Sequence, residues 1–181
     1  YFNGGPANPA GSGTWWSAGG RVCHTSAMSD ATGGRPLWLL HLEDSAEDHA
    51  LAMAHLRRAG LSVKAERVET EPEYRRALDA HDWDAVLSDF NLPGFDGLQA
   101  QRILQATRPE IPFILISGAI GEDAAVEVMR HGASDYLLKN NLARLAMAVE
   151  HAVAAGRDRK ARLQSDRELA RSRQQLSELA Q

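Results

Sequence analysis

The chain has 181 residues, of which 44% are hydrophobic and 24% charged, a balance typical of a globular domain and not of a fibrous or disordered chain. Its longest apolar runs have about six residues, too few to cross a bilayer, and the single cysteine excludes an intrachain disulfide and a four-cysteine zinc site. The net charge of -4 argues against coating of nucleic acid, and we expect a reducing, cytoplasmic setting.

Charge and glycine divide the chain into three parts. Residues 1–35 carry a net charge of +1 and eight of the 15 glycines, residues 36–156 carry -8, and residues 157–181 carry +3. The first part lacks a sustained hydrophobic period and a secretory signal, which predicts a flexible leader. The middle part has the length of one ordinary domain, and we expect the last part to be a helical linker or signalling helix.

Apolar runs and amphipathic segments alternate through the middle part. Five runs predict strands, at residues 37–42, 61–68, 85–87, 113–116 and 136–138. Five segments with helical spacing follow them, at residues 45–60, 70–78, 98–107, 122–131 and 142–153. Ser45 with Asp48, and Thr70 with Glu73, have the spacing of capping boxes. This order predicts an α/β fold, a five-stranded parallel sheet with helices on both faces, in which the alternating second strand lies at an edge.

Histidine offers no metal motif in this pattern. His41 lies within an apolar strand, which is typical of a core histidine rather than a ligand. The other six histidines show no metal-ligand spacing; they are His24, His49, His55, His81, His131 and His151.

Polar side chains follow four of the five predicted strands. Glu43 and Asp44 come after the first strand, Asp89 after the third, Ser117 after the fourth and Lys139 after the fifth. The carboxyl ends of parallel strands share one edge of the sheet, where ligands of open α/β folds bind. We therefore expect these five side chains to meet at one rim, to which the edge strand adds no comparable group.

Such a cluster of carboxylates needs a compensating charge. Two carboxylates about 4 Å apart repel by roughly 4 kcal/mol at an effective dielectric near 20. Oxygen ligands with room for water suit Mg²⁺, and a carboxylate beside Mg²⁺ suits in-line attack on a phosphoryl group. Lys139 then supplies positive charge for the phosphoryl oxygens, and Ser117 supplies a hydroxyl donor.

Residues 36–156 resemble the receiver domain of two-component response regulators. The resemblance rests on Glu43-Asp44, the segment from Asp89 to Gly97, Ser117-Gly118 and the run Tyr136-Leu137-Leu138-Lys139, which match in order and approximate spacing. It implies a doubly wound, flavodoxin-like sheet with strand order 2-1-3-4-5, extended here by a long C-terminal helix.

The resemblance also implies a role for each matching residue. Asp89 would accept a phosphoryl group from a phosphohistidine of a histidine kinase or phosphotransfer protein. Mg²⁺ would be bound by Asp44, Asp89 and the backbone carbonyl of Asn91, with Glu43 acting through water. Ser117 and Lys139 would hold the phosphoryl oxygens, and Tyr136 would turn inward as Ser117 moves.

The matching residues leave two departures from the family and several alternatives. Asn140 follows Lys139, where members commonly have proline, and Ala119, two residues after Ser117, has no charge to steer a water molecule. An aspartyl-phosphate phosphohydrolase is the main alternative, although Asn91 occupies the position of its usual second aspartate. A scaffold that never becomes phosphorylated also stays open. Nucleotide binding is disfavoured because neither phosphate-binding glycine motif occurs.

The predicted last helix continues beyond the domain. Residues 157–181 contain no proline or glycine, and Leu169, Leu176 and Leu179 hint at a heptad seam. Three interpretations stay open: a solvated linker, a helix that forms a homodimer and leads to an output domain beyond residue 181, and a basic RNA-binding arm. Mixed charge and the lack of aromatic residues disfavour the last.

Overall fold

The computed structural model describes residues 35–118, 126–127 and 129–179 of the chain. The predicted leader, apart from Arg35, therefore lies outside the described residues. So do residues 122–125 and 128, half of the predicted helix 122–131, whereas its residues 126–127 and 129–130 are helical.

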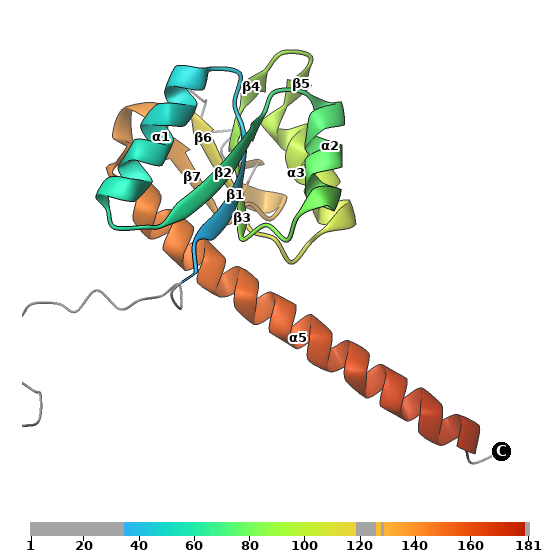
Figure 1. Cartoon of the computed structure of the whole chain (residues 1–181). Helices are drawn as coiled ribbons and strands as arrows, with labels where there is room; N and C mark the ends of the chain where they lie inside the picture. Colours follow the sequence, from blue (N-terminus) through green and yellow to red (C-terminus); the bar gives the residue numbers. More distant parts are fainter. Residues whose placement is uncertain (1–34, 119–125, 128, 180–181) are drawn as a thin grey trace, which may run out of the picture.

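The centre of the fold is a five-stranded parallel sheet, as expected (Figure 1). Its spatial order is β2-β1-β3-β6-β7, which corresponds to the implied order 2-1-3-4-5. The strands are β1 (Leu37–Leu42), β2 (Val63–Val68), β3 (Ala85–Asp89), β6 (Phe113–Ser117) and β7 (Asp135–Leu138). All residues of β3 and β6 are buried, as expected for strands covered on both faces.

Helices cover both faces of the sheet. On one face, α1 (Ala46–Arg58) and the start of α5 (Leu145–Leu179) pack against side chains such as Leu39, Leu87 and Ile114. On the other face, α2 (Glu71–Ala80) and α3 (Gly97–Thr107) pack against Leu40 and Phe113. Successive β1 residues thus serve opposite cores, because side chains alternate along a strand.

The predicted capping boxes form to different extents. At α2, the Glu73 carboxylate accepts a hydrogen bond from the Thr70 backbone N–H at 3.2 Å. At α1, the Ser45 hydroxyl accepts from the Asp48 N–H at 3.2 Å, but the Ser45 N–H donates to Glu43 at 3.1 Å. The α1 prediction is therefore only half correct, and the Asp48 carboxylate is left for another partner.

The segment after β3 makes a small hairpin that the sequence pattern did not reveal. Strands β4 (Asn91–Leu92) and β5 (Phe95–Asp96) pair antiparallel, and Gly94 between them has φ of +71°. Gly97 follows, and a Cβ there would lie 2.6 Å from a Leu115 methyl group and 3.0 Å from the Asp89 carbonyl oxygen. A larger residue would therefore displace the backbone that carries Asp89.

The last helix leaves the domain at the amino ends of the strands (Figure 1). After β7, the short 3₁₀ segment η1 (Lys139–Arg144) leads into α5, which packs through Val149 and Val153. A Cβ on Gly156 would lie 2.8 Å from the Pro112 ring, so the helix and the loop before β6 are in close contact there.

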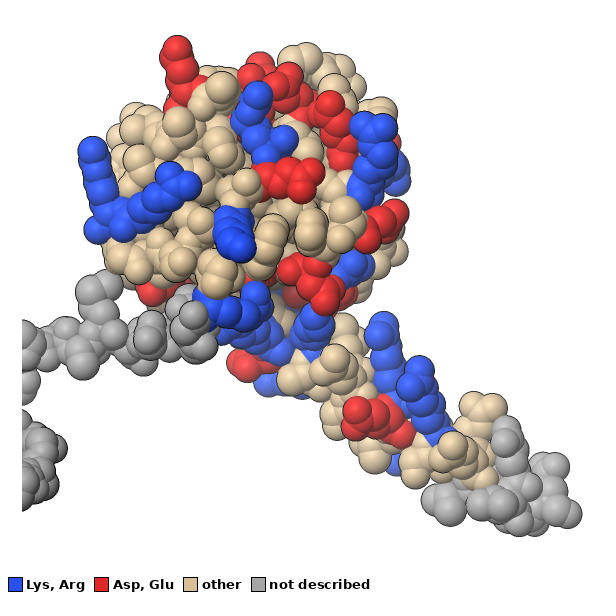
Figure 2. Space-filling view, in the orientation of Figure 1, with Lys and Arg blue, Asp and Glu red and all other residues tan. Residues whose placement is uncertain are grey.

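Beyond this point α5 projects away from the domain. Every side chain of residues 158–175 is exposed, including Leu163 and Leu169 at 39% and 54%. Figure 2 shows mainly basic side chains with some acidic ones along it. Within the described residues, no helix is both long and apolar enough to cross a membrane.

Candidate functional site

Three carboxylates meet at the carboxyl end of the sheet, as the sequence predicts. Glu43 and Asp44 directly follow β1, and Asp89 ends β3 beside it. One carboxylate oxygen of each lies within 4.8 Å of those of the other two. Within residues 35–118, 126–127 and 129–179, this is the only group of three acidic, histidine or cysteine side chains spaced to hold a metal ion.

The two oxygens of the Asp89 carboxylate have different partners. Oδ1 accepts hydrogen bonds from the backbone N–H groups of Phe90 and Asn91 at 2.6 and 3.4 Å. Oδ2 faces the Lys139 amine at 2.8 Å. Its side chain is 10% exposed, so Asp89 is oriented by the backbone yet reachable from solvent at the rim.

Glu43 is the most deeply buried member of the cluster, with its side chain 1% exposed. Burial raises the pKa of its carboxyl, while hydrogen bonds from the Lys139 amine and the Ser45 N–H act in the opposite direction. Glu43 therefore depends on these donors to remain ionised at the rim.

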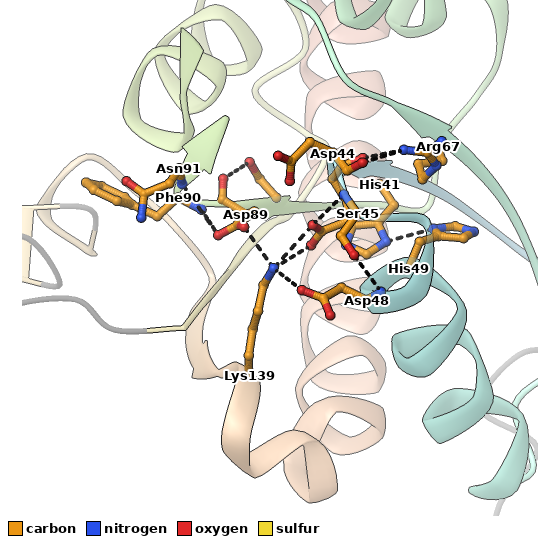
Figure 3. A network of polar contacts seen from close by, with 12 residues as sticks. His41, Asp44, Ser45, Asp48, His49, Arg67, Asp89, Phe90, Asn91 and Lys139 are labelled. Atoms are coloured by element: carbon orange, nitrogen blue, oxygen red, sulfur yellow. Dashed lines mark hydrogen bonds and ion pairs between the residues drawn. The ribbon is translucent and has the colours of Figure 1, made fainter. Parts of the chain in front are cut away.

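Lys139 contacts three carboxylates at once (Figure 3). Its Nζ lies 2.6 Å from Asp48, 2.8 Å from Asp89 and 2.9 Å from Glu43. Burial alone would lower the pKa of Lys139, but the hydrogen bonds to these carboxylates outweigh it and raise that pKa. The amine is thus a fixed positive charge within the acidic cluster.

The remaining predicted site residues lie on β6, β4 and β7. Ser117 ends β6, and its buried hydroxyl has no hydrogen-bond partner among the described residues. Asn91 opens β4 next to Asp89, which places its carbonyl in the same loop. Tyr136 of β7 is half-buried against the core on the α2 and α3 side, and burial raises its pKa.

Two side chains of the network were missed by sequence reasoning. Asp48 was assigned to helix capping, yet its carboxylate makes the shortest ion pair of Lys139. Arg67 lies on edge strand β2, and its guanidinium donates to the backbone carbonyls of Glu43 and Asp44 at 3.0 and 3.2 Å. The sequence offered only two signals for them: Asp48 lies one helical turn after the acidic pair, and Arg67 lies near the end of an edge strand.

His41 belongs to the core, as expected. It is 1% exposed, and its Nδ1 lies 2.9 Å from Nδ1 of His49 on α1. One of the two rings therefore donates to the other.

The donor set at the rim fits a hard divalent cation. All three converging groups are carboxylates, and Mg²⁺ prefers oxygen ligands and retains several waters. The rim has four acids, three of which contact its single amine, and a cation would balance the resulting excess of negative charge. The arrangement therefore suits chemistry at a phosphoryl group, with Asp89 as the accessible oxygen nucleophile.

Comparison with known protein sequences agrees with this geometry. Residues 40–150 match the family model described as Response regulator receiver domain. The regulatory protein LuxO of Vibrio vulnificus is 32% identical over 113 residues, 62% of this chain and 24% of LuxO. The DNA-binding transcriptional regulator NtrC of Escherichia coli is 35% identical over 81 residues, 45% of this chain and 17% of NtrC. The chain thus spans a quarter or less of the length of these curated relatives.

Solved structures share the fold. The signal receiver domain of a LuxO repressor protein from Vibrio parahaemolyticus superposes with a TM-score of 0.63 at 20% identity, covering 70% of this chain and 97% of that domain. The receiver domain of the sensor histidine kinase PA1611 from Pseudomonas aeruginosa, which has a magnesium ion in its active-site cleft, gives 0.57 at 24% identity. It covers 66% of this chain and 99% of that domain.

Proposed function

The chain belongs to the response regulator receiver domain family, a family of regulatory domains, and on this premise we propose that it is switched by phosphorylation of Asp89. The observation that carries the proposal is the convergence of Glu43, Asp44 and Asp89 at one end of the sheet, where the Lys139 amine contacts Glu43 and Asp89. The phosphoryl donor would be a phosphohistidine of a histidine kinase or phosphotransfer protein.

The proposed transfer would use the carboxylate of Asp89, the amine of Lys139 and the hydroxyl of Ser117. An oxygen of the Asp89 carboxylate attacks phosphorus, the bond between phosphorus and the imidazole nitrogen breaks, and the imidazole leaves with the electron pair. Lys139 neutralises the phosphoryl oxygens as its contact with Asp89 is released. The buried hydroxyl of Ser117, which has no partner among the described residues, donates to another phosphoryl oxygen.

The rim residues would also hold Mg²⁺. Asp44, Asp89 and the Asn91 carbonyl are the proposed ligands, with Glu43 acting through water. When bound, the ion would supply charge neutralisation for the transferring phosphoryl group. The carboxylate donor set supports this assignment, and the magnesium-containing receiver domain of PA1611 shares the fold.

The signal would leave the domain through α5. Movement of Ser117 and inward rotation of half-buried Tyr136 would alter the packing of β7 and the start of α5. The exposed continuation of that helix would pass the change to a further domain, to a second copy of the chain, or to both. The greater length of LuxO and NtrC is consistent with an output domain beyond residue 181.

The phosphohydrolase alternative lacks support from the site. Such an enzyme usually carries a second aspartate two residues after the nucleophile as its acid/base group, and Asn91 occupies that position here. Toward Asp89 this residue offers its backbone N–H, which donates to the Asp89 carboxylate. Steady release of phosphate from a small phosphoester would revive this alternative.

The proposal is tested by phosphoryl uptake from acetyl phosphate in the presence of Mg²⁺, followed by intact-protein mass spectrometry. Wild-type protein should gain one phosphoryl group, and Asp89→Asn should gain none. Asp79→Asn is the matched control, because Asp79 is an exposed residue of α2 and should not affect uptake. Equal uptake by wild type and Asp89→Asn, or none by wild type, would contradict the proposal.

A further inference from the structure

Asp48 contacts the site although, unlike Glu43, Asp89 and Lys139, it does not lie at the end of a strand. It lies in the first turn of α1, and its carboxylate is 42% exposed. Its Oδ2 is 2.6 Å from the Lys139 amine, closer than either Asp89 or Glu43. Helix capping does not require this carboxylate, because the backbone N–H of Asp48 alone bonds to the Ser45 hydroxyl.

The three contacts of Lys139 account for all of its hydrogen-bond donors, since a lysine ammonium group has three N–H bonds. Two of the acceptors, Asp89 and Glu43, belong to the group that would bind a cation and a phosphoryl group. Both are therefore drawn into other interactions during phosphoryl transfer. Asp48 lies outside that group of three carboxylates and can keep its contact throughout.

The surroundings of Lys139 favour a lasting contact with Asp48. A small pocket of about 60 Å³ borders both side chains and is also lined by Leu51 and Ala52 of α1 and by Leu142 of η1. The Lys139 side chain is 22% exposed, so its amine is partly shielded from water, which strengthens a charged hydrogen bond. Among the described residues, Asp48 is the only acid of α1 that forms an ion pair with the amine.

We propose that Asp48 is a positioning residue that anchors the Lys139 amine at the rim while its other contacts pass from the carboxylates to the phosphoryl group. The role rests on the proposed phosphorylation of Asp89 and extends it to a residue of α1. Asp48 does not touch the reacting atoms and acts through Lys139 alone.

The first test measures how strongly Asp48 protects the Lys139 amine from reaction, in the absence of metal ion and phosphoryl donor. Trace acetylation of the metal-free full chain, read by peptide mass spectrometry, reports the reactivity of each amine; the chain has three lysines, and Lys64 and Lys160 serve as internal standards. Asp48→Asn should raise labelling of Lys139 about fivefold, as expected when one of three charge-assisted hydrogen bonds is lost. Asp48→Glu should restore most of the protection.

Glu47→Gln is the matched control, because it removes the same charge from an exposed neighbour in the same helical turn. It should leave labelling of Lys139 unchanged. Circular dichroism of each variant checks that α1 is retained, which we expect because the backbone cap on Ser45 stays intact.

The second test measures phosphoryl uptake from acetyl phosphate at saturating Mg²⁺. Asp48→Asn should lower the rate constant about fivefold, whereas Glu47→Gln should match wild type. An unchanged rate in Asp48→Asn overturns the inference, whatever the labelling shows, and so does unchanged labelling. Lack of uptake by wild type would instead refute the phosphorylation of Asp89, while the labelling would still show whether Asp48 holds Lys139.

Discussion

The two ends of the sheet each have a cluster of ion pairs, with opposite charge balance. At the rim, one lysine contacts Glu43, Asp48 and Asp89, and a fourth acid, Asp44, lies beside Glu43 and Asp89. At the other end of the sheet, four cations and three acids surround a pocket of about 280 Å³. We call this group at the base of the domain the base cluster; its members are Arg35, Asp82, Asp84, Arg108, Glu110, Arg157 and Lys160. Because only the rim has an excess of acids over cations, the rim is the end of the sheet that suits a further cation.

Asp84 illustrates how the base cluster is satisfied within the protein. Its side chain is 6% exposed and accepts hydrogen bonds from the Arg35 guanidinium at 2.6 and 3.0 Å and from the Trp38 N–H at 3.0 Å. Arg157 of α5 approaches it at 3.8 Å. Asp84 therefore connects three segments: Arg35 before β1, Trp38 within β1 and Arg157 of α5. The acids of the rim have a single amine among them and retain an excess of negative charge.

Removing the cation of the rim should have the largest effect. Lys139→Ala leaves the buried Glu43 carboxylate without its charged partner, and we expect the free energy of unfolding in metal-free buffer to fall by about 3 kcal/mol. The same variant should gain more stability from added Mg²⁺ than wild type, because the amine no longer competes for Glu43 and Asp89. Urea unfolding with and without Mg²⁺ measures both changes.

Lys160→Ala provides the control for this prediction. Lys160 is 49% exposed and lies 3.8 Å from Asp82 in the base cluster, so its loss should change stability by no more than about 0.5 kcal/mol and leave the response to Mg²⁺ unchanged. Equal losses from Lys139→Ala and Lys160→Ala would remove the distinction between the two clusters.

The next largest effect is expected from Asp84. Asp84→Ala should lower the free energy of unfolding by about 2 kcal/mol, because the Trp38 N–H loses its acceptor and the Arg35 guanidinium loses its ion pair. Asp84→Asn retains an acceptor oxygen and should cost less. Urea unfolding at fixed salt measures the series, and phosphoryl uptake should be the same in all three proteins.

An exposed ion pair away from both clusters calibrates that series. Arg75 and Glu71 are an i,i+4 pair on α2 at 2.8 Å, both about half exposed. Arg75→Ala should cost only about 0.3–0.5 kcal/mol. A loss of the same size in Asp84→Ala would mean that burial of Asp84 adds nothing to its ion pairs.

At acid pH, the stability of the fold should depend on the buried ring of His41. Burial lowers the pKa of His41 to about 3, and the positive charges of His49, Lys139 and Arg67 act in the same direction. The ring is neutral in the fold but binds a proton in the unfolded chain below about pH 6.5, so its contribution to stability is complete above that pH and is lost as the pH falls toward 3.

This contribution should amount to about 1.4 kcal/mol per pH unit between about pH 5.5 and 4. His41→Leu should reduce the slope of unfolding free energy against pH by that amount, measured by urea unfolding in metal-free buffer. An unchanged slope would show that His41 titrates alike in the folded and unfolded states.

The fold and the centre of the site were predictable because they depend on local signals. Apolar runs such as 113–116 specify buried strands, and strand ends place Asp89 and Lys139 at one edge whatever the loops do. The implied strand order is confirmed by the sheet. The proposed roles of Asp89, Ser117 and Tyr136 stay predictions until the phosphorylation experiments are done.

The rest of the network depends on side-chain direction, which periodicity does not encode. Asp48 has the spacing of a capping residue, and only the position of Lys139 shows that its carboxylate turns the other way. Arg67 bonds to backbone carbonyls, which leave no trace in the sequence. The base cluster joins Arg35, Asp84 and Arg157 from three distant segments, so no local motif could reveal it.

The contact between Gly156 and Pro112 makes the exposed helix a lever. About 35 Å of α5 lies beyond Gly156, at 1.5 Å per residue. A tilt of only about 5° at this contact would move the far end by roughly 3 Å, a shift comparable to those that repack subunit interfaces. A tilt too small to disturb the core of the domain would thus shift the far end of the helix by several ångströms.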